Sequence, residues 1–237
     1  MILFCPNYTK VLYLKFSEKK LLLFDFDGTL IDSAPDLALA INHTLKSIGH
    51  KAFSQDTIRS WVGNGAQTLV KRALSGKSEV DENIDEVLFK KALDIFLSFY
   101  AQNVCVATKA YPNVKSTLEK LKNKGYRLTI VTNKPYEFIE PILEGLELDA
   151  LFELLVGGDT LAVKKPNPEP LLYVCEKLDV TTDETLMIGD SKNDILAAHA
   201  ASIQSIGVSY GYNYGEDIGI YKPDLIVDDF ADILKSL

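Results

Sequence analysis

Residues 21–30, with the sequence LLLFDFDGTL, constrain the fold of this 237-residue chain more than any other stretch. Four apolar residues lead directly into Asp25, Asp27 comes two positions later, and Gly28 follows at once. An uninterrupted apolar run bounded by a turn signal is typical of a strand that is buried on both faces of a parallel sheet. Asp25 is therefore predicted at the carboxyl end of that strand, where open α/β sheets bind their ligands.

The two carboxylates of this stretch are predicted to serve one site. Residues two apart on a regular strand share a face, so Asp25 and Asp27 are expected to converge. A pair of carboxylates beside an apolar strand is costly unless a cation or a proton holds it together. The alternative is a strand followed by a solvated, Asp-rich turn, and the rest of the chain has to decide between the two.

Composition limits the classes of partner. A hydrophobic content of 47% predicts a globular protein with a large core, and a net charge of −8 argues against nucleic acid. A phosphorylated small molecule stays possible, because a divalent metal can reverse the sign of the local field. Three isolated cysteines, Cys5, Cys105 and Cys175, predict no disulfide framework or zinc site. A cytoplasmic location is expected, with no membrane partner.

The chain divides into three parts by pattern. Residues 1–20 form an extension of unclear role, too short to span a membrane. Residues 35–107 show helical spacing at about 35–48, 55–61, 66–74 and 84–99, and no strand is expected between residues 32 and 109. Residues 21–34 and 108–237 alternate strands with helices, which predicts right-handed crossovers and a parallel sheet. We therefore expect an α/β protein with a Rossmann-like core and an inserted, all-helical cap.

Polar side chains stand where the predicted core strands end. In chain order they are Asp25, Asp27, Thr132, Lys165, Asp190 and Asp194. A parallel sheet brings its carboxyl ends together at one edge, so we expect these groups to meet. Several carboxylates with one hydroxyl and one ammonium suit attack on a phosphate monoester. A hard cation such as Mg²⁺ would neutralise the dianionic substrate, while the hydroxyl and the ammonium hold its phosphoryl oxygens.

The sequence resembles the haloacid-dehalogenase-like hydrolase superfamily over roughly residues 20–237. Four motifs of that superfamily occur in order: residues 25–30 (DFDGTL), 131–134 (VTNK), 164–166 (KKP) and 189–194 (GDSKND). Each motif alone is weak, but four of them in order at this spacing make a strong match. The resemblance implies Mg²⁺-dependent hydrolysis of a small phosphate monoester.

The resemblance also implies a role for each matched residue. Asp25 would be the nucleophile that forms an aspartyl-phosphate. Asp27 would protonate the leaving alcohol and later deprotonate the attacking water. Thr132 and Asn133 would bind phosphoryl oxygens, and Lys165 would neutralise both Asp25 and the phosphoryl group.

The metal ligands follow from the same resemblance. Asp25 and Asp190 would bind Mg²⁺ through their side chains, and Asp27 through its backbone carbonyl. Asp194 would act through a water or by orienting its neighbours. For Thr132 and Asp194 the alternative role is helix capping.

The cap is expected to read the part of the substrate beyond the phosphoryl group. Gly63, Asn64 and Gly65 precede a predicted helix, whose free N–H groups would face an anion such as a carboxylate. Arg72 is a secondary candidate for added charge at this site. Lys164 is interpreted as a solvated charge.

Two other functions fit parts of the pattern. A sugar-phosphate mutase of the same superfamily would use the same core, with a cap that retains a bisphosphate. A non-catalytic phospho-acceptor domain also combines acidic residues, threonine and lysine at strand ends. It would not need the helical insertion of residues 35–107, nor a base that discharges the acyl phosphate.

Overall fold

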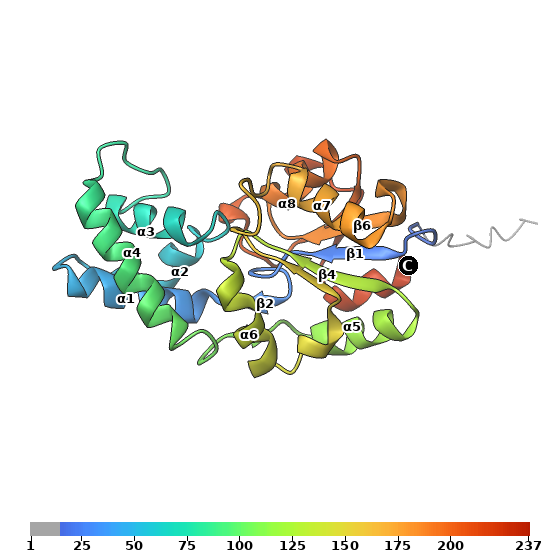
Figure 1. Ribbon diagram of the computed structural model, residues 1–237, viewed down its shortest axis with the longest axis horizontal. Helices are drawn as coiled ribbons and strands as arrows, with labels where there is room; N and C mark the ends of the chain where they lie inside the picture. The colour runs from blue at the N-terminus through green and yellow to red at the C-terminus, as the bar shows by residue number, and fades with distance from the viewer. Residues whose placement is uncertain (1–14) are drawn as a thin grey trace, which may run out of the picture.

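In the computed structural model, which describes residues 15–237, the core is a sheet of six parallel strands in the order β5-β4-β1-β6-β7-β8 (Figure 1). The strands are β1 (Leu21–Phe24), β4 (Arg127–Val131), β5 (Leu154–Val156), β6 (Thr185–Gly189), β7 (Gln204–Val208) and β8 (Leu225–Val227). Strand β1 lies in the middle of the sheet. The next core strands, β4 and β5, lie on one side of it, and β6, β7 and β8 lie on the other side. The carboxyl end of β1 therefore lies at the switch point, where sheets of this kind bind ligands.

Helices cover both faces of this sheet, α7 and α8 on one and α5 and α6 on the other (Figure 1). Their bounds are α5 (Val114–Asn123), α6 (Ile139–Gly145), α7 (Glu169–Leu178) and α8 (Lys192–Ala200). Alternate residues of β1 point into two separate cores: Leu21 and Leu23 face α7 and α8, while Leu22 and Phe24 belong to the larger core on the other side. Burial on both faces explains why this strand is apolar throughout. The predicted α/β fold with a parallel sheet is confirmed.

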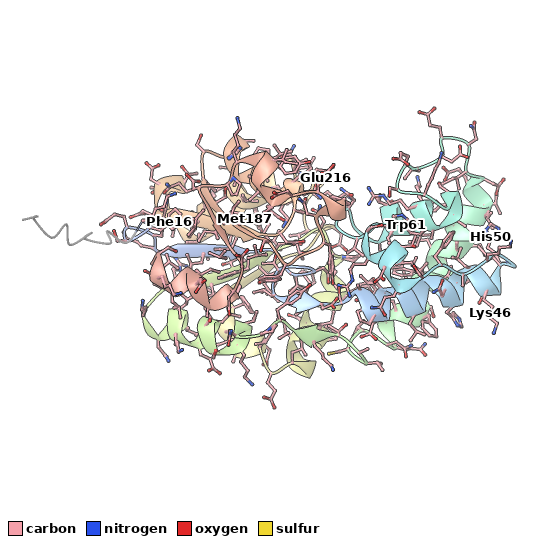
Figure 2. All side chains as sticks on the ribbon, turned by 180° about the vertical axis from the view of Figure 1, so that it is seen from behind. Phe16, Lys46, His50, Trp61, Met187 and Glu216 are labelled. Atoms are coloured by element: carbon pink, nitrogen blue, oxygen red, sulfur yellow. The ribbon has the colours of Figure 1, made fainter. Side chains whose placement is uncertain are left out.

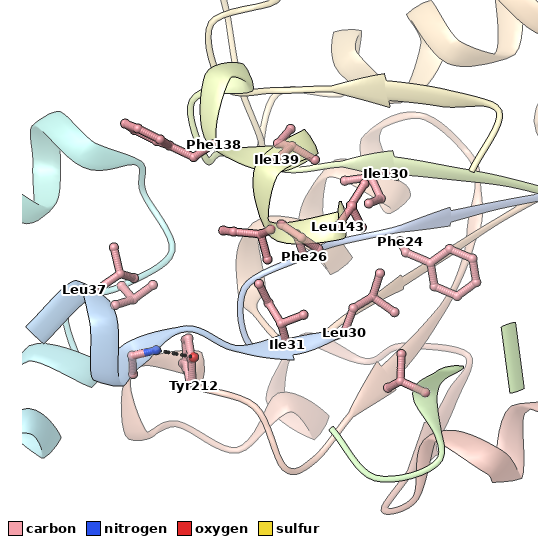
Figure 3. Packing of buried hydrophobic residues seen from close by; sticks show 14 of the residues in the cluster. Phe24, Phe26, Leu30, Ile31, Leu37, Ile130, Phe138, Ile139, Leu143 and Tyr212 are labelled. Atoms are coloured by element: carbon pink, nitrogen blue, oxygen red, sulfur yellow. Dashed lines mark hydrogen bonds between the residues drawn. The ribbon is translucent and has the colours of Figure 1, made fainter. Parts of the chain in front are cut away.

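The larger core continues past the end of β1 into the turn that follows it. Figure 3 shows Phe24 and Phe26 from this stretch beside Leu30 and Ile31, with Ile130 of β4 close by. All five side chains are fully buried. This packing fixes the backbone between them, and with it the two carboxylates of the stretch.

Four further helices lie together beyond one end of the sheet (Figure 1). They are α1 (Ala34–Ser47), α2 (Gln55–Arg59), α3 (Ala66–Ser75) and α4 (Glu86–Ala101). Buried side chains such as Trp61 fill the space between them, as Figure 2 shows for that residue. Ser54 and Asp85 cap α2 and α4, each accepting a hydrogen bond from a backbone N–H of the first turn. We call α1–α4 and their loops the cap.

Short elements complete the chain. The 3₁₀ helices are η1 (Tyr136–Phe138), η2 (Asp149–Leu151), η3 (Thr182–Glu184), η4 (Asn213–Gly215), η5 (Ile218–Tyr221) and η6 (Phe230–Lys235). Among residues 15–237, no helix combines the length and the apolar character needed to cross a bilayer. The predictions made for residues 1–14 lie outside the described part of the chain.

A two-stranded antiparallel ribbon joins the cap to the core. It pairs β2 (Ile31–Asp32) with β3 (Lys109–Ala110). The expectation of no strand between residues 32 and 109 is therefore wrong at both borders. Strands of two residues are too short to show the alternation by which a strand is recognised in a sequence.

The Asp36 side chain holds residues 106–108, which lead from the cap into β3. It lies in the first turn of α1 and is 1% exposed. Its carboxylate accepts hydrogen bonds from the backbone N–H groups of Val106, Ala107 and Thr108 at 2.8–3.0 Å, and from the Thr108 hydroxyl at 2.7 Å. One side chain thus satisfies the polar groups of a segment that has no regular structure of its own.

Replacing Asp36 by alanine should therefore destabilise the protein. The substitution leaves the N–H groups of residues 106–108 without an acceptor, so we expect the free energy of unfolding to fall by at least about 3 kcal/mol. Asp94→Ala, at an exposed position of α4, is the control and should change it by less than about 0.5 kcal/mol. Urea titration followed by circular dichroism measures both. Equal midpoints for the two variants would contradict the role given to Asp36.

Candidate active site

A buried lysine, Lys165, lies between two carboxylates at the carboxyl edge of the sheet. Its ammonium is 2.9 Å from an oxygen of Asp25 and 2.6 Å from one of Asp194, and it also donates to the carbonyl of Val131. These three acceptors use all three N–H groups of a lysine ammonium. Burial opposes the charged form, but the attraction of Asp194 and Asp25 outweighs burial and raises the pKa of Lys165. The lysine is therefore charged at neutral pH.

The strand ends explain how these groups meet. Asp25 directly follows β1, and its N–H donates to the carbonyl of Ile188 in β6 at 2.9 Å. Val131 ends β4 on the other side of β1, and Asp194 lies in the first turn of α8. The sequence analysis predicted that Asp25, Asp194 and Lys165 meet, and the structure brings Lys165 into contact with both carboxylates.

Three buried carboxylates form an acidic cluster at this edge. One oxygen from each of Asp25, Asp190 and Asp194 lies within 4.8 Å of the other two. Burial, together with repulsion from Asp194, raises the pKa of Asp25 to about 7. Burial and repulsion from Asp25 raise the pKa of Asp190 to about 8. When all three carboxylates are ionised, they and the single ammonium of Lys165 leave two negative charges, which a divalent cation with a preference for oxygen ligands, such as Mg²⁺, would balance.

Asp190 is held by hydrogen bonds on both oxygens. It accepts from the Thr29 hydroxyl at 2.9 Å and from the backbone N–H of Tyr212 at 2.7 Å. Gly28 packs directly against this carboxylate and has a φ of 94°; a Cβ there would lie 2.5 Å from an oxygen of Asp190. The glycine that follows Asp27 is therefore needed both for the turn and for space beside the acidic cluster.

The Asp27 carboxylate lies apart from the acidic cluster. It accepts a hydrogen bond from the Ser33 hydroxyl at 2.6 Å, and both of its oxygens are within 3.2 Å of the Lys134 ammonium. That ammonium also donates to the hydroxyl of Tyr100 in α4 at 2.7 Å. Asp27 therefore has an ion-pair partner of its own, and the predicted metal contact through its backbone carbonyl stays a prediction.

Thr132 and Asn133 follow β4 and are both buried. The Thr132 hydroxyl accepts from the backbone N–H of Lys134 at 3.2 Å, so its own hydrogen is available to another acceptor. The side-chain amide of Asn133 donates to the carbonyls of Gly63 and Lys165 at 3.0 and 2.9 Å. Both N–H groups of this amide are thus used between cap and core. Any contact of Asn133 with a phosphoryl oxygen would fall to its backbone N–H.

A partly enclosed cavity of about 30 Å³ lies between these groups and the cap. It has room for roughly two water molecules. Asp25, Asp27, Thr132 and Lys165 line it from the core, among others. The cap side is mainly apolar and includes the side chains of Leu37, Val62, Leu69 and Phe96. A phosphate ester is larger than this cavity, so we expect the cap to move away from the core when such a substrate binds.

The cap loop of residues 63–65 closes the cavity through hydrogen bonds to the core. The Gly63 carbonyl accepts from the side-chain amides of Asn133 and Asn193, each at 3.0 Å. The Asn64 carbonyl accepts from the Lys164 ammonium at 2.8 Å, and its side-chain oxygen accepts from the Tyr214 hydroxyl at 2.9 Å. Gly63 and Gly65 line the cavity, whereas Asn64 is not among its lining residues, and the contact of this loop with a substrate stays a prediction.

Two basic residues lie elsewhere than the sequence suggested. The guanidinium of Arg72 donates to the carbonyls of Trp61 and Ser78 and lies over the ring of Tyr214. Arg72 is not among the residues that line the cavity. Lys164 was interpreted as a solvated charge. It is instead half-buried, and its ammonium bonds to the cap loop.

Sequence reasoning gave no role to Lys134, Asn193, Tyr214 or Tyr100. The first two stand inside motifs that were recognised, VTNK and GDSKND, so they were available as candidates. Tyr214 lies in a loop after β7, and Tyr100 lies near the end of an amphipathic helix. For these two tyrosines no pattern in the sequence marks a contact with a distant segment.

Comparison with known proteins agrees with this geometry. The family model described as haloacid dehalogenase-like hydrolase matches residues 22–208. A phosphoglycolate phosphatase from Colwellia psychrerythraea is 57% identical over 224 residues, covering 94% of this chain and 99% of that protein. A phosphoglycolate phosphatase from Pasteurella multocida is 45% identical over 222 residues, covering 93% and 99%.

Solved structures give the same result. The crystal structure of a predicted phosphoglycolate phosphatase from Haemophilus somnus has a TM-score of 0.86 and 44% identity, covering 92% of this chain and 98% of that one. The family model and these identities confirm the resemblance inferred from the four motifs, and with it an enzyme of the hydrolase class. The chain belongs to the haloacid dehalogenase-like hydrolase family, and within it is similar to phosphoglycolate phosphatases.

Proposed function

We propose that this protein is a Mg²⁺-dependent phosphatase that hydrolyses 2-phosphoglycolate to glycolate and phosphate through an aspartyl-phosphate. The observation that carries the proposal is the contact of Lys165 with Asp25 inside a cavity that Asp27 and Thr132 also line. The curated relatives of 45–57% identity named above support the choice of substrate. We further propose a cytoplasmic enzyme whose partner is this small metabolite.

The first half of the reaction uses Asp25 and Asp27. A carboxylate oxygen of Asp25 attacks phosphorus, the bond from phosphorus to the ester oxygen breaks, and Asp27 gives its proton to that oxygen. Lys165 and the Thr132 hydroxyl hold the phosphoryl oxygens as charge spreads over them. The neighbouring Lys134 and Ser33 hold the Asp27 carboxylate in place.

The second half returns the enzyme to its starting state. Asp27, now ionised, takes a proton from a water whose oxygen attacks phosphorus. The bond from phosphorus to Asp25 breaks and inorganic phosphate leaves. The apolar cap face excludes other water while the acyl phosphate exists. Asp25, Asp190 and Asp194 would hold the Mg²⁺, which supplies positive charge beside the phosphoryl group when bound.

Asp25→Asn should abolish turnover and acyl-phosphate formation, because an amide cannot act as the nucleophile. The amide oxygen still accepts from Lys165, and one charge is removed from a crowded acidic cluster. We therefore also expect a higher Tm than that of the wild type in chelator at pH 8. Phosphate release and differential scanning fluorimetry measure the two effects. Near wild-type turnover in a pure preparation of the variant would refute the assignment.

Exhaustive chelation should abolish activity, and Mg²⁺ should restore it and raise the wild-type Tm, because the cation balances the two excess charges of the acidic cluster.

Asp190→Ala should raise the Mg²⁺ concentration needed for half activity and reduce the rise in Tm that Mg²⁺ causes. The control is Asp94→Ala, whose carboxylate is on the cap surface. Full activity after chelation would exclude a metal role for the cluster.

Gly65→Ala should impair closure of the cap. A Cβ at this position would lie 2.8 Å from the carbonyl oxygen of Asn133, and φ is 85°. Gly49→Ala is the matched control, since its φ is 77° but no atom lies within 4 Å of the added Cβ. We expect kcat/KM for 2-phosphoglycolate to fall roughly 10- to 100-fold for Gly65→Ala only. Similar kinetics for the two variants would show that the loop does not seat against the core during catalysis.

A further inference from the structure

The cavity contains two buried ammonium groups, and they differ in how many separate groups they contact. Lys165 donates to Asp25, Asp194 and the Val131 carbonyl, so none of its three N–H groups is left. Lys134 donates to one carboxylate, that of Asp27, and to the Tyr100 hydroxyl. These are three hydrogen bonds to two groups, and the two longer ones, at 3.1 and 3.2 Å, go to the same carboxylate, so one of these two N–H groups can turn to a further acceptor that enters the cavity.

Tyr100 offers an unused hydrogen at the same place. Its hydroxyl accepts from Lys134, and its own O–H has no acceptor among residues 15–237. Tyr100 is 1% exposed, and burial raises its pKa to about 12, so the hydroxyl keeps its hydrogen at neutral pH. The ring stacks on Phe96 at 5.6 Å and meets the edge of Phe138 at 4.9 Å. This packing fixes the direction of the hydroxyl.

A buried hydroxyl with a free hydrogen, 2.7 Å from a buried ammonium, forms a site for an anion. Both residues line the cavity. The rest of the cap side is mainly apolar, and the loop of residues 63–65 turns the carbonyls of Gly63 and Asn64 toward core donors. These two carbonyls are thus bound to the core, and the contact of an anion with the N–H groups that follow the loop stays a prediction.

We propose that Lys134 from the core and Tyr100 from the cap together bind the carboxylate of the substrate and so set its length. This inference rests on the proposed function. Asp27 serves the ester oxygen, and the Lys134 ammonium is 3.1 Å from the Asp27 carboxylate. In 2-phosphoglycolate a single CH₂ separates the ester oxygen from the carboxylate group. A carboxylate bound at Lys134 and Tyr100 therefore keeps the ester oxygen beside Asp27, whereas a longer acid displaces it.

The pair also offsets a repulsion that this substrate creates. Proton transfer to the ester oxygen leaves Asp27 ionised beside the substrate carboxylate, and two such charges in a buried site are unfavourable. Lys134 contacts Asp27 already and lies where it would also contact the incoming group. A phosphate ester without a carboxylate leaves the O–H of Tyr100 unpaired inside the cavity, which costs binding energy.

The test compares kcat/KM for 2-phosphoglycolate and for ethyl phosphate, which lacks the carboxylate, in the full chain with Mg²⁺. The ratio of the two constants isolates recognition of the carboxylate from the chemical step. Tyr100→Phe keeps the ring packing and should lower this ratio roughly 10- to 100-fold. Lys134→Met should lower it at least as much, and Lys134→Arg should restore part of it. Lys91→Met, an exposed lysine on the same cap helix, is the control and should keep the wild-type ratio.

A second measurement does not depend on turnover. Isothermal titration of glycolate in the presence of Mg²⁺ and inorganic phosphate should show binding to the wild type and a weaker Kd for Tyr100→Phe. A wild-type ratio that Tyr100→Phe and Lys134→Met both retain would overturn this proposal and leave the phosphatase function standing. A wild type that hydrolyses both esters equally would do the same. A wild type that hydrolyses other phosphate esters but not 2-phosphoglycolate would overturn the substrate assignment itself.

Discussion

The ion group of Lys165, Asp25 and Asp194 is the interaction on which the rest of the structure depends. Buried charges of this kind cost several kcal/mol each by order of magnitude unless they are paired and hydrogen-bonded. The pairing requires the ends of β1 and β4 and the start of α8 to lie close together, and the two apolar cores on either side of β1 hold them there. Packing of the two apolar cores thus offsets the cost of holding these charges together, at the place where a cation and a phosphoryl group would bind.

Much of this arrangement follows from the sequence because it depends on local pattern. The apolar run before Asp25 predicts a strand buried on both faces, and βα alternation predicts that the carboxyl ends of such strands meet. Asp25, Thr132, Lys165 and Asp190 each stand at or near such an end, so topology alone brings them together. No side-chain detail was needed for that step.

The remaining contacts depend on the directions of side chains from segments far apart in the chain. Arg72 was placed correctly on its helix, but its guanidinium turns to the carbonyls of Trp61 and Ser78, and helical period gives no signal of this choice. Tyr100 reaches Lys134 across 34 positions, and only the packing of α4 against the core decides that contact. The ribbon of β2 and β3 was missed because two residues carry no periodicity.

One hydrogen-bonded residue explains how closure and chemistry are linked in this molecule. The Asn133 amide donates to the Gly63 carbonyl in the cap and to the carbonyl of Lys165 in the core. If the cap moves away to admit a substrate, the hydrogen bond to Gly63 must break. The Asn133 amide, which also binds the carbonyl of Lys165, then becomes free to reorient. When the cap returns, the same amide again fixes the segment that positions the ammonium on Asp25. A substrate that prevents closure therefore also leaves the lysine less constrained, so the fit of the substrate and the readiness of the nucleophile depend on one side chain.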